Sequence, residues 1–220
     1  FSTFKKSKGC CFKSWINNFV IEVIDNFLDD KLSAKVEDYF EKKLPWYFID
    51  NISIAENEGL GNYGFYHVFV INNKFTTTEH LPAVEPVISK IQEKVNLPKI
   101  LRVRADKTVW QNGFTKTYSP HTDFRKKLPN KIITGDTDGA SENFKSVIYY
   151  INDSSGDTIF FKERQTEGTM IPTNIDLLTI DKVVTPNRNR LVIFDGDIIH
   201  TGQAPITHNF RHLLNLNFDK

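Results

Sequence analysis

The chain has few cysteines and no long apolar run. Its only two cysteines, Cys10 and Cys11, are adjacent and cannot build a framework of disulfide bonds, which fits a reducing compartment. No apolar run approaches the roughly 18–20 residues that span a bilayer, and residues 1–14 lack the apolar core of a signal peptide. We therefore expect a cytoplasmic protein without a membrane partner.

The chain also has almost no net charge. Its 28 basic and 27 acidic residues give a formal net charge of +1, which offers no general attraction to a phosphate backbone. This balance disfavours a nucleic-acid partner. Aromatic side chains are abundant, and the 18 phenylalanines supply bulky filler for the core of a packed sheet.

Hydrophobic periodicity predicts helices only within the first hundred residues. Apolar residues recur at helical spacing over 32–43 and over 82–95, and Pro82 is well placed near the start of the second helix. Short β-branched or aromatic runs between turn signals predict strands. These strands cover 15–24, 46–49, 65–71, 101–110, 147–151, 158–161, 175–184, 190–195 and 210–218.

Many short strands with turns between them indicate a sandwich or a closed roll. We expect an α+β fold that is mainly β, in which residues 1–99 form a flank packed on a β core of residues 100–220, within one structural domain. The polar stretch 125–145 is long for a connection and predicts a loop beside a site. Its segment 136–139 lacks most of the ligands of a calcium loop.

Three potential metal ligands stand out in the second half of the chain. His121 and Asp123 are two residues apart, so on extended backbone their side chains point to the same face. His200 follows the segment Leu191-Val-Ile-Phe-Asp-Gly-Asp-Ile-Ile, whose apolar run covers 191–194, and we expect it at the exit of a strand. A lone histidine more often packs than binds a metal. Two imidazoles and one carboxylate on one face nevertheless suit a non-haem Fe(II) centre.

Arg211 opens a strand with alternating faces. Arg211, Leu213, Asn215 and Asn217 share one polar face, whereas His212 and the apolar residues between them share the other. A buried arginine needs an anion, and a carboxylate accepts its two parallel hydrogen bonds. The alternative is a structural pair with an acidic side chain of the protein. His208, in an expected loop, and His212, on the far face, are competitors for the metal.

Taken in order, His121-Thr-Asp123, His200 and Arg211 resemble the H-x-D…H…R pattern of the Fe(II)- and 2-oxoglutarate-dependent dioxygenases. The resemblance is to their prolyl-4-hydroxylase-like branch and covers about residues 100–218. Tyr118 matches a tyrosine that stands three residues before the first histidine in that branch. The segments 146–152, 156–160 and 190–195 follow in the order and spacing of the branch.

The resemblance implies a double-stranded β-helix, a jelly-roll fold like that of the cupins. It implies that His121, Asp123 and His200 bind Fe(II), and that Arg211 and Tyr150 bind the distal carboxylate of 2-oxoglutarate, with Tyr149 facing the other way. Gln111 stands near the position of another co-substrate contact, where the branch often has a tyrosine. Ascorbate is an accessory reductant that such enzymes can use.

The function that the resemblance implies is hydroxylation with O2, which converts 2-oxoglutarate into succinate and CO2. A prolyl residue of a protein or peptide is the first expectation for the substrate, and a free amino acid or another small metabolite is the second. The carboxylate at Asp123 disfavours a halogenase. The alternative is a cupin-like non-oxidative metal enzyme or a jelly-roll binding module, which would leave Arg211 and Tyr150 without a co-substrate.

Overall fold

The computed structural model describes residues 21–50, 52, 63–111, 117–124, 143–166, 171–172 and 174–220. The helices are α1 (Asp30–Lys42) and α2 (Leu81–Val95), and Ile175–Leu177 forms a 3₁₀ turn. The strands are β1 (Glu22–Ile24), β2 (Tyr47–Ile49), β3 (Gly64–Ile71), β4 (Lys74–Phe75), β5 (Ile100–Val109), β6 (Phe144–Tyr150), β7 (Thr158–Arg164), β8 (Ile180–Val184), β9 (Arg190–Asp195), β10 (Ile198–Gly202) and β11 (Phe210–Asp219).

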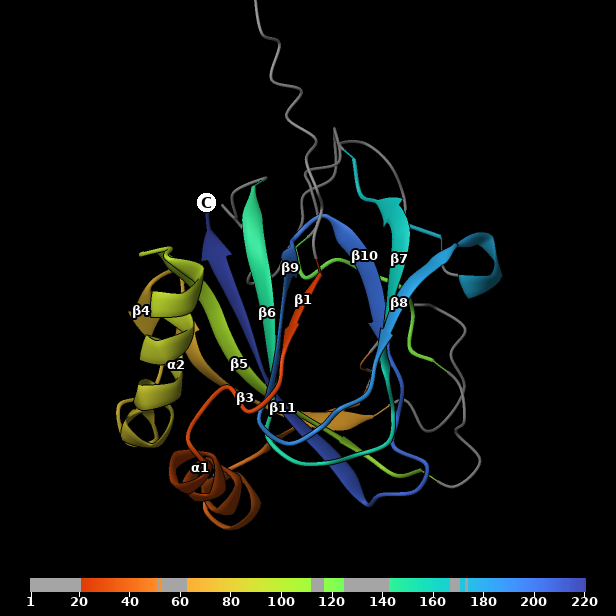
Figure 1. Ribbon diagram of the computed structural model, residues 1–220. Helices are drawn as coiled ribbons and strands as arrows, with labels where there is room; N and C mark the ends of the chain where they lie inside the picture. Colours follow the sequence, from red (N-terminus) through yellow and green to blue (C-terminus); the bar gives the residue numbers. More distant parts are fainter. Residues whose placement is uncertain are drawn as a thin grey trace, which may run out of the picture.

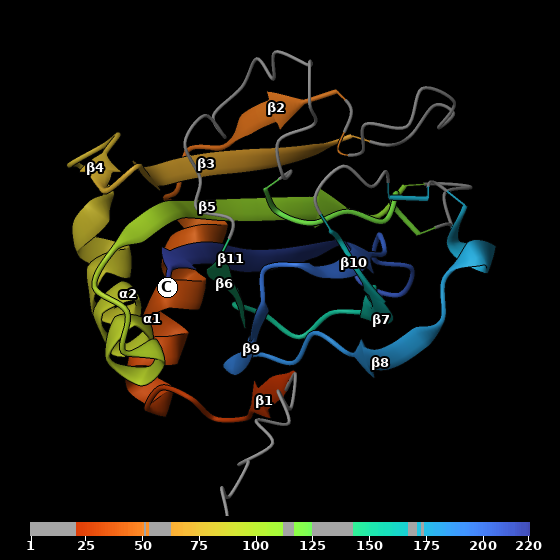
Figure 2. The ribbon, with the colours of Figure 1, turned by 90° about the horizontal axis from the view of Figure 1, so that it is seen from above.

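Two antiparallel sheets face each other in the described part of the chain (Figure 1). The larger sheet has the order β1-β9-β6-β11-β5-β3-β2, with β4 paired to β3, and the smaller has the order β10-β7-β8. Both helices lie on the outer face of the larger sheet, and the view from above shows the smaller sheet on the opposite side (Figure 2). The mainly β roll with flanking helices is the fold class that the sequence predicts.

Both predicted helices form, with ends set by their local sequence. The side chain of Asp29 accepts a hydrogen bond from the backbone nitrogen of Leu32 at 2.9 Å and caps the start of α1. Pro82 lies in the first turn of α2, and Asn96 ends that helix in the left-handed region at a φ of 55°. The buried faces of the two helices carry Val36, Phe40, Val84, Val87, Ile88 and Ile91.

Two hydrophobic layers hold the fold together. One lies between the helices and the larger sheet, and the other lies between the two sheets. Strand β11 supplies both, because Leu214, Leu216 and Phe218 pack toward the helices while Leu213 packs between the sheets. This is the alternation that the sequence predicts for residues 211–218, and it leaves Arg211 and Asn215 on the interior face.

The strand boundaries differ from the predictions at several places. The predicted strand over 190–195 forms as β9, and a turn at Gly196 and Asp197 leads into β10, which was not predicted. His200 therefore lies in the middle of β10 and not at a strand exit. The predicted strand over 175–184 divides into the 3₁₀ turn and β8. The short strand β4 was not predicted, since two exposed residues carry no periodicity.

Several predictions fall on parts of the chain that the structure does not describe. Cys10 and Cys11, the start of the strand over 15–24, and residues 125–142 of the predicted loop lie outside the described residues, whereas β6 begins at Phe144. The division at residue 99 stays a prediction. The β3–β5 pairing and the helical core cluster both run across it. Among the described helices, none is long and apolar enough to cross a bilayer.

Candidate active site

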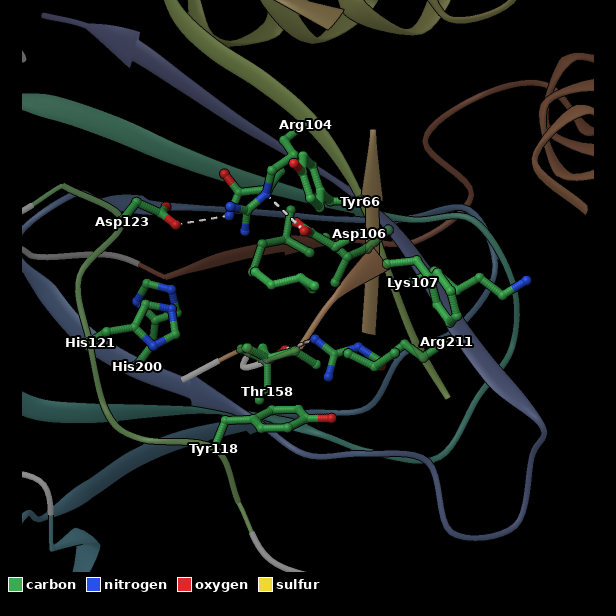
Figure 3. Close-up of a pocket in the computed structure, with 18 residues that line it drawn as sticks. Tyr66, Arg104, Asp106, Lys107, Tyr118, His121, Asp123, Thr158, His200 and Arg211 are labelled. Carbon is green, nitrogen blue, oxygen red and sulfur yellow. Dashed lines mark hydrogen bonds and ion pairs between the residues drawn. The ribbon is translucent and has the colours of Figure 1, made fainter. Parts of the chain in front are cut away.

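His121, Asp123 and His200 come together between the two sheets. One potential ligand atom from each residue lies within 4.8 Å of the others, and this is the one such cluster found in the described residues (Figure 3). His200 belongs to β10, while His121 and Asp123 belong to the irregular segment 117–124. Two backbone hydrogen bonds of 2.9 Å join His121 and His200 in an isolated bridge. That bridge, and not a full strand, sets the two rings opposite each other.

The two imidazoles are oriented by backbone carbonyls. The Nδ1 atom of His121 lies 2.9 Å from the Ser119 oxygen, and that of His200 lies 3.1 Å from the Ile198 oxygen. A carbonyl accepts only, so each Nδ1 donates its proton, which leaves Nε2 as the nitrogen that can bind a metal. Burial and the neighbouring His121 lower the pKa of His200 to about 4, against the opposing effect of Asp123. At neutral pH, His200 is therefore in the form that binds a metal.

Asp123 is held as a carboxylate by four donors from the larger sheet. Its Oδ1 accepts from the Asn215 side chain at 2.9 Å and from Arg102 Nη2 at 3.3 Å. Its Oδ2 accepts from the Ser146 hydroxyl at 2.6 Å and from the Asn217 side chain at 2.8 Å. Burial alone would raise the pKa of Asp123. The charges of His200 and Arg102 and the Ser146 hydrogen bond outweigh it and hold the pKa well below its usual range.

These three side chains fit a divalent transition metal. Two imidazoles and one carboxylate meet on one face, as in non-haem Fe(II) centres, and each is fixed by partners behind it. The carboxylate already has as many donors as it has lone-pair sites. A metal at Oδ1 would replace the 3.3 Å contact with Arg102, the longest of the four.

Arg211 is buried in the same pocket, which encloses about 140 Å³. Its Nη1 donates to the carbonyls of Gly156 and Gln203, each at 3.0 Å, and its Nη2 donates to the Thr158 hydroxyl at 3.2 Å. Its Nε is buried and has no partner among the described residues, and no described carboxylate pairs with the guanidinium. Gly202 makes room for it, since a Cβ there would lie 2.9 Å from Nη1.

Tyr150 acts on the pocket through Thr158. The Tyr150 hydroxyl donates to Thr158 Oγ1 at 2.6 Å, and it is Thr158, not Tyr150, that lines the pocket. Because Oγ1 accepts from both Tyr150 and Arg211, the Thr158 proton is left to donate elsewhere. Tyr149 packs in the helical core, and its hydroxyl donates to Asn189 at 3.1 Å, so it faces away as predicted.

Gln111 is not brought to the pocket. It is buried, its Nε2 donates to the Tyr63 carbonyl at 2.7 Å, and it is not among the lining residues. Tyr118, three residues before the first histidine, does line the pocket.

The two histidines that could compete for the metal lie outside the pocket. His208 is in an exposed loop beside Ser155, and His212 stacks on Trp46 with ring centroids 5.1 Å apart.

Sequence reasoning missed the residues that support the site. Arg102 and Ser146 hold Asp123, and Arg104 and Asp106 line the pocket. The sequence did carry part of this signal. The predicted polar face of residues 211–217 includes Asn215 and Asn217, and a strand is predicted over 101–110. Which of these faces the metal ligands depends on strand pairing, which periodicity does not give.

Comparisons with known proteins place the fold. No family model matches the chain, and no curated protein matches it. Solved structures do match. A 2OG-Fe(II) oxygenase family protein from Burkholderia pseudomallei has a TM-score of 0.59 and 9% identity, with 90% of this chain and 84% of that one covered. The non-heme alpha ketoglutarate dependent epimerase SnoN of nogalamycin biosynthesis has a TM-score of 0.57 and 10% identity, with 93% of this chain and 79% of that one covered.

A third similar structure is a prolyl hydroxylase from Trichoplax adhaerens in complex with a peptide fragment of the hypoxia inducible factor oxygen degradation domain. It has a TM-score of 0.54 and 15% identity, with 92% of this chain and 84% of that one covered. At these identities the similarity establishes the architecture. The chain therefore has the fold of the Fe(II)/2-oxoglutarate oxygenases, a double-stranded β-helix core with flanking helices.

Proposed function

We propose that this chain is an Fe(II)- and 2-oxoglutarate-dependent dioxygenase that hydroxylates its substrate. One observation carries the proposal. The metal-ligand cluster shares a pocket with a buried arginine whose Nε has no partner among the described residues. A buried guanidinium without an acid is costly unless a ligand supplies the anion. The balanced reaction takes R–H, O2 and 2-oxoglutarate to R–OH, succinate and CO2.

The metal would be held by His121, Asp123 and His200. Bound there, Fe(II) supplies the activation of O2 that no side chain can provide. The chain's share is to keep the three ligands oriented. The Ser119 and Ile198 carbonyls fix the two rings, and the donors from β5, β6 and β11 keep Asp123 ionised.

The distal carboxylate of 2-oxoglutarate would lie against Arg211 and Thr158. Arg211 offers its unpaired Nε–H, and Thr158 offers a hydroxyl proton that no neighbour uses. Tyr150 would then hold Thr158 in place through its hydroxyl and would not contact the carboxylate itself. This modifies the expectation that Tyr150 contacts the carboxylate itself. Gln111 is left out of the proposed contacts because it does not line the pocket.

A prolyl residue of a peptide and a small metabolite are both substrates that this fold accommodates. A neighbour in complex with a peptide supports the first, and an epimerase of nogalamycin biosynthesis supports the second. A cytoplasmic location remains a prediction. A cupin-like non-oxidative metal enzyme or a binding module would explain the roll and the metal ligands. Neither would explain the unpaired Nε of Arg211.

Anaerobic titration of the Fe(II)-loaded protein with 2-oxoglutarate tests the proposal. We expect the weak visible charge-transfer band of a keto acid bound to Fe(II), and we expect its loss in Asp123→Ala. Arg211→Gln should raise the 2-oxoglutarate Kd by about 10- to 100-fold. Arg190→Gln is the matched control, because Arg190 pairs with Asp25 and does not line the pocket. Iron binding without a band at any concentration of keto acid would refute the proposal.

A further inference from the structure

A second arginine lines the pocket beside the metal ligands. Arg104 lies on β5 directly opposite Asn215 of β11, and Asn215 is the residue that donates to Asp123. The Nε of Arg104 lies 2.8 Å from Oδ1 of Asp106 (Figure 3). The side chains of Arg104 and Asp106 are 34% and 21% exposed, so both reach the open part of the pocket.

This ion pair leaves binding groups free on both partners. Arg104 approaches Asp106 through Nε without a well-directed hydrogen bond, and its two terminal nitrogens make no hydrogen bond to the described residues. Asp106 is engaged through Oδ1, and its other oxygen has no described partner either. A pair built only for stability would be expected to use the fork of the guanidinium on both carboxylate oxygens. This pair instead offers donors and an acceptor side by side to the pocket.

The backbones of Arg104 and Arg211 lie well apart on the pocket-facing side of β5 and β11. Arg211 pairs across the sheet with Thr108, and Arg104 lies four residues before Thr108 on β5. Four residues of a strand span roughly 13 Å. The row of Leu213 and Asp106 lies between the two arginines. Arg104 lies at the end of this part of the sheet that is nearest to Asp123, and Arg211 lies at the other end. Arg104 is therefore placed for the substrate and Arg211 for the co-substrate.

The walls around the pair are apolar. Ile148 and Leu213 come from the strands beneath the pocket, and Ile49, Ile52 and Tyr66 come from the side of β2 and β3. A ligand on Arg104 and Asp106 would thus have both its charges paired and its carbon skeleton against hydrocarbon.

We propose that the primary substrate is a free α-amino acid, whose carboxylate binds Arg104 and whose ammonium binds Asp106. This inference rests on the proposed function and names its substrate class. The carboxylate accepts from the terminal nitrogens of Arg104, and the ammonium donates to the free oxygen of Asp106. Each charge of the amino acid therefore meets an opposite charge of the protein. A prolyl residue inside a peptide carries neither charge and would leave both groups unpaired.

Ligand binding to the Zn(II)-loaded protein tests this without turnover. Thermal shifts are measured with each of the twenty common L-amino acids at millimolar concentration, with and without 2-oxoglutarate, and the strongest is titrated by calorimetry. We expect at least one amino acid to bind. Its N-acetyl and carboxamide derivatives, each lacking one charge, should bind about 10- to 100-fold more weakly.

Variants then assign the charges. Arg104→Gln should weaken the amino acid by about 10- to 100-fold. Asp106→Asn should weaken it by a similar factor and have a smaller effect on the matching carboxylic acid without the amine. Arg190→Gln and Asp25→Asn are the matched controls, because they break an ion pair of the same kind that does not line the pocket. They should leave amino-acid binding unchanged.

The outcomes separate the two proposals. If 2-oxoglutarate binds and no amino acid does, the inference is overturned and the proposed function stands. The same holds if a proline-containing peptide binds with equal strength to the wild type and to Asp106→Asn. If an amino acid binds through Arg104 while 2-oxoglutarate does not bind, the substrate site stands and the dioxygenase proposal fails. The first outcome is measured on the wild-type protein alone, so a poorly folding variant does not decide it.

Discussion

The hydroxyl of Tyr150 lies 2.6 Å from Oγ1 of Thr158, and Thr158 in turn lies 3.2 Å from Nη2 of Arg211. Tyr150 therefore fixes the group that faces the pocket and does not face it itself. A tyrosine that lies behind a threonine affects a ligand through the direction of the threonine proton. Its loss should weaken the ligand less than the loss of the threonine.

Substitutions at these two positions should thus differ in size. Tyr150→Phe should raise the 2-oxoglutarate Kd by about 3- to 10-fold, because Thr158 loses one of its two donors. Thr158→Val should raise it about tenfold or more, since it also leaves the Tyr150 hydroxyl and the Nη2 of Arg211 without their hydrogen-bond partner. Calorimetric titration of the Zn(II)-loaded protein gives both values. Tyr149→Phe, which faces the helices, is the control, and a larger effect of Tyr150→Phe than of Thr158→Val would contradict this order.

Gly202 should tolerate no side chain if Arg211 binds the co-substrate. A Cβ at this position would lie 2.9 Å from Nη1 of Arg211, so Gly202→Ala must displace the guanidinium. We expect about a tenfold loss of 2-oxoglutarate affinity, with Zn(II) binding retained because the metal ligands are untouched. The two titrations measure this separately. Unchanged affinity in Gly202→Ala would mean that Arg211 is not the carboxylate site.

Metal should stabilise the folded chain through His121, Asp123 and His200. At a free metal concentration of 100 Kd, stabilisation is roughly 2.7 kcal/mol. For a chain of this size that corresponds to a Tm rise of roughly 5–10 °C. Differential scanning fluorimetry with Zn(II), reversed by a chelator, measures the rise. His200→Ala should abolish it, and His208→Ala, in an exposed loop, should retain it. Loss of the shift in His208→Ala would put the metal elsewhere.

Stability should fall as the pH drops, with His212 as one cause. Burial, with a contribution from Lys107, lowers the pKa of His212 to about 3. The unfolded chain has a histidine pKa of about 6.5, so below that pH it binds a proton that the folded state does not. The stabilisation is therefore present above pH 6.5 and is progressively lost as the pH falls toward 3. Between pH 7.5 and 5.0 the loss from this group is about 2 kcal/mol.

Urea unfolding of the metal-free protein at these two pH values measures that loss. His212→Phe keeps an aromatic ring stacked between Trp46 and Phe210 and removes the titrating group. We expect the pH-dependent loss to shrink by about 2 kcal/mol in this variant. Equal pH dependence in the variant and in the wild type would show that His212 is protonated in the folded state.

The sequence predicted those helices and strands whose apolar residues follow a regular period. Helical spacing located α1 and α2, and the alternation over residues 211–218 placed Arg211 on the interior face. Short strands were harder to read. The strand over 190–195 was predicted, but β10 was not, because five residues are too few for periodicity to identify a strand.

The candidate site was predictable as a set of ligand types but not as a set of contacts. His121, Asp123, His200 and Arg211 were identified by their chemistry and order. Their partners were not, because Arg102, Ser146 and Asn217 reach Asp123 from three strands whose mutual register only the folded sheet defines. For the same reason, the sequence did not show that Thr158, and not Tyr150, lines the pocket. The two residues belong to different sheets.

The metal ligands draw on both sheets, and this has a kinetic consequence. His200 is part of the smaller sheet, whereas every donor that holds the Asp123 side chain belongs to the larger sheet. A bound ion would act as a cross-link between the two layers. Local separation of the layers would then break the set of ligands, so a bound ion would oppose the opening of the roll. The rate of amide hydrogen exchange along β10 would fall as the fraction of metal-bound protein rises.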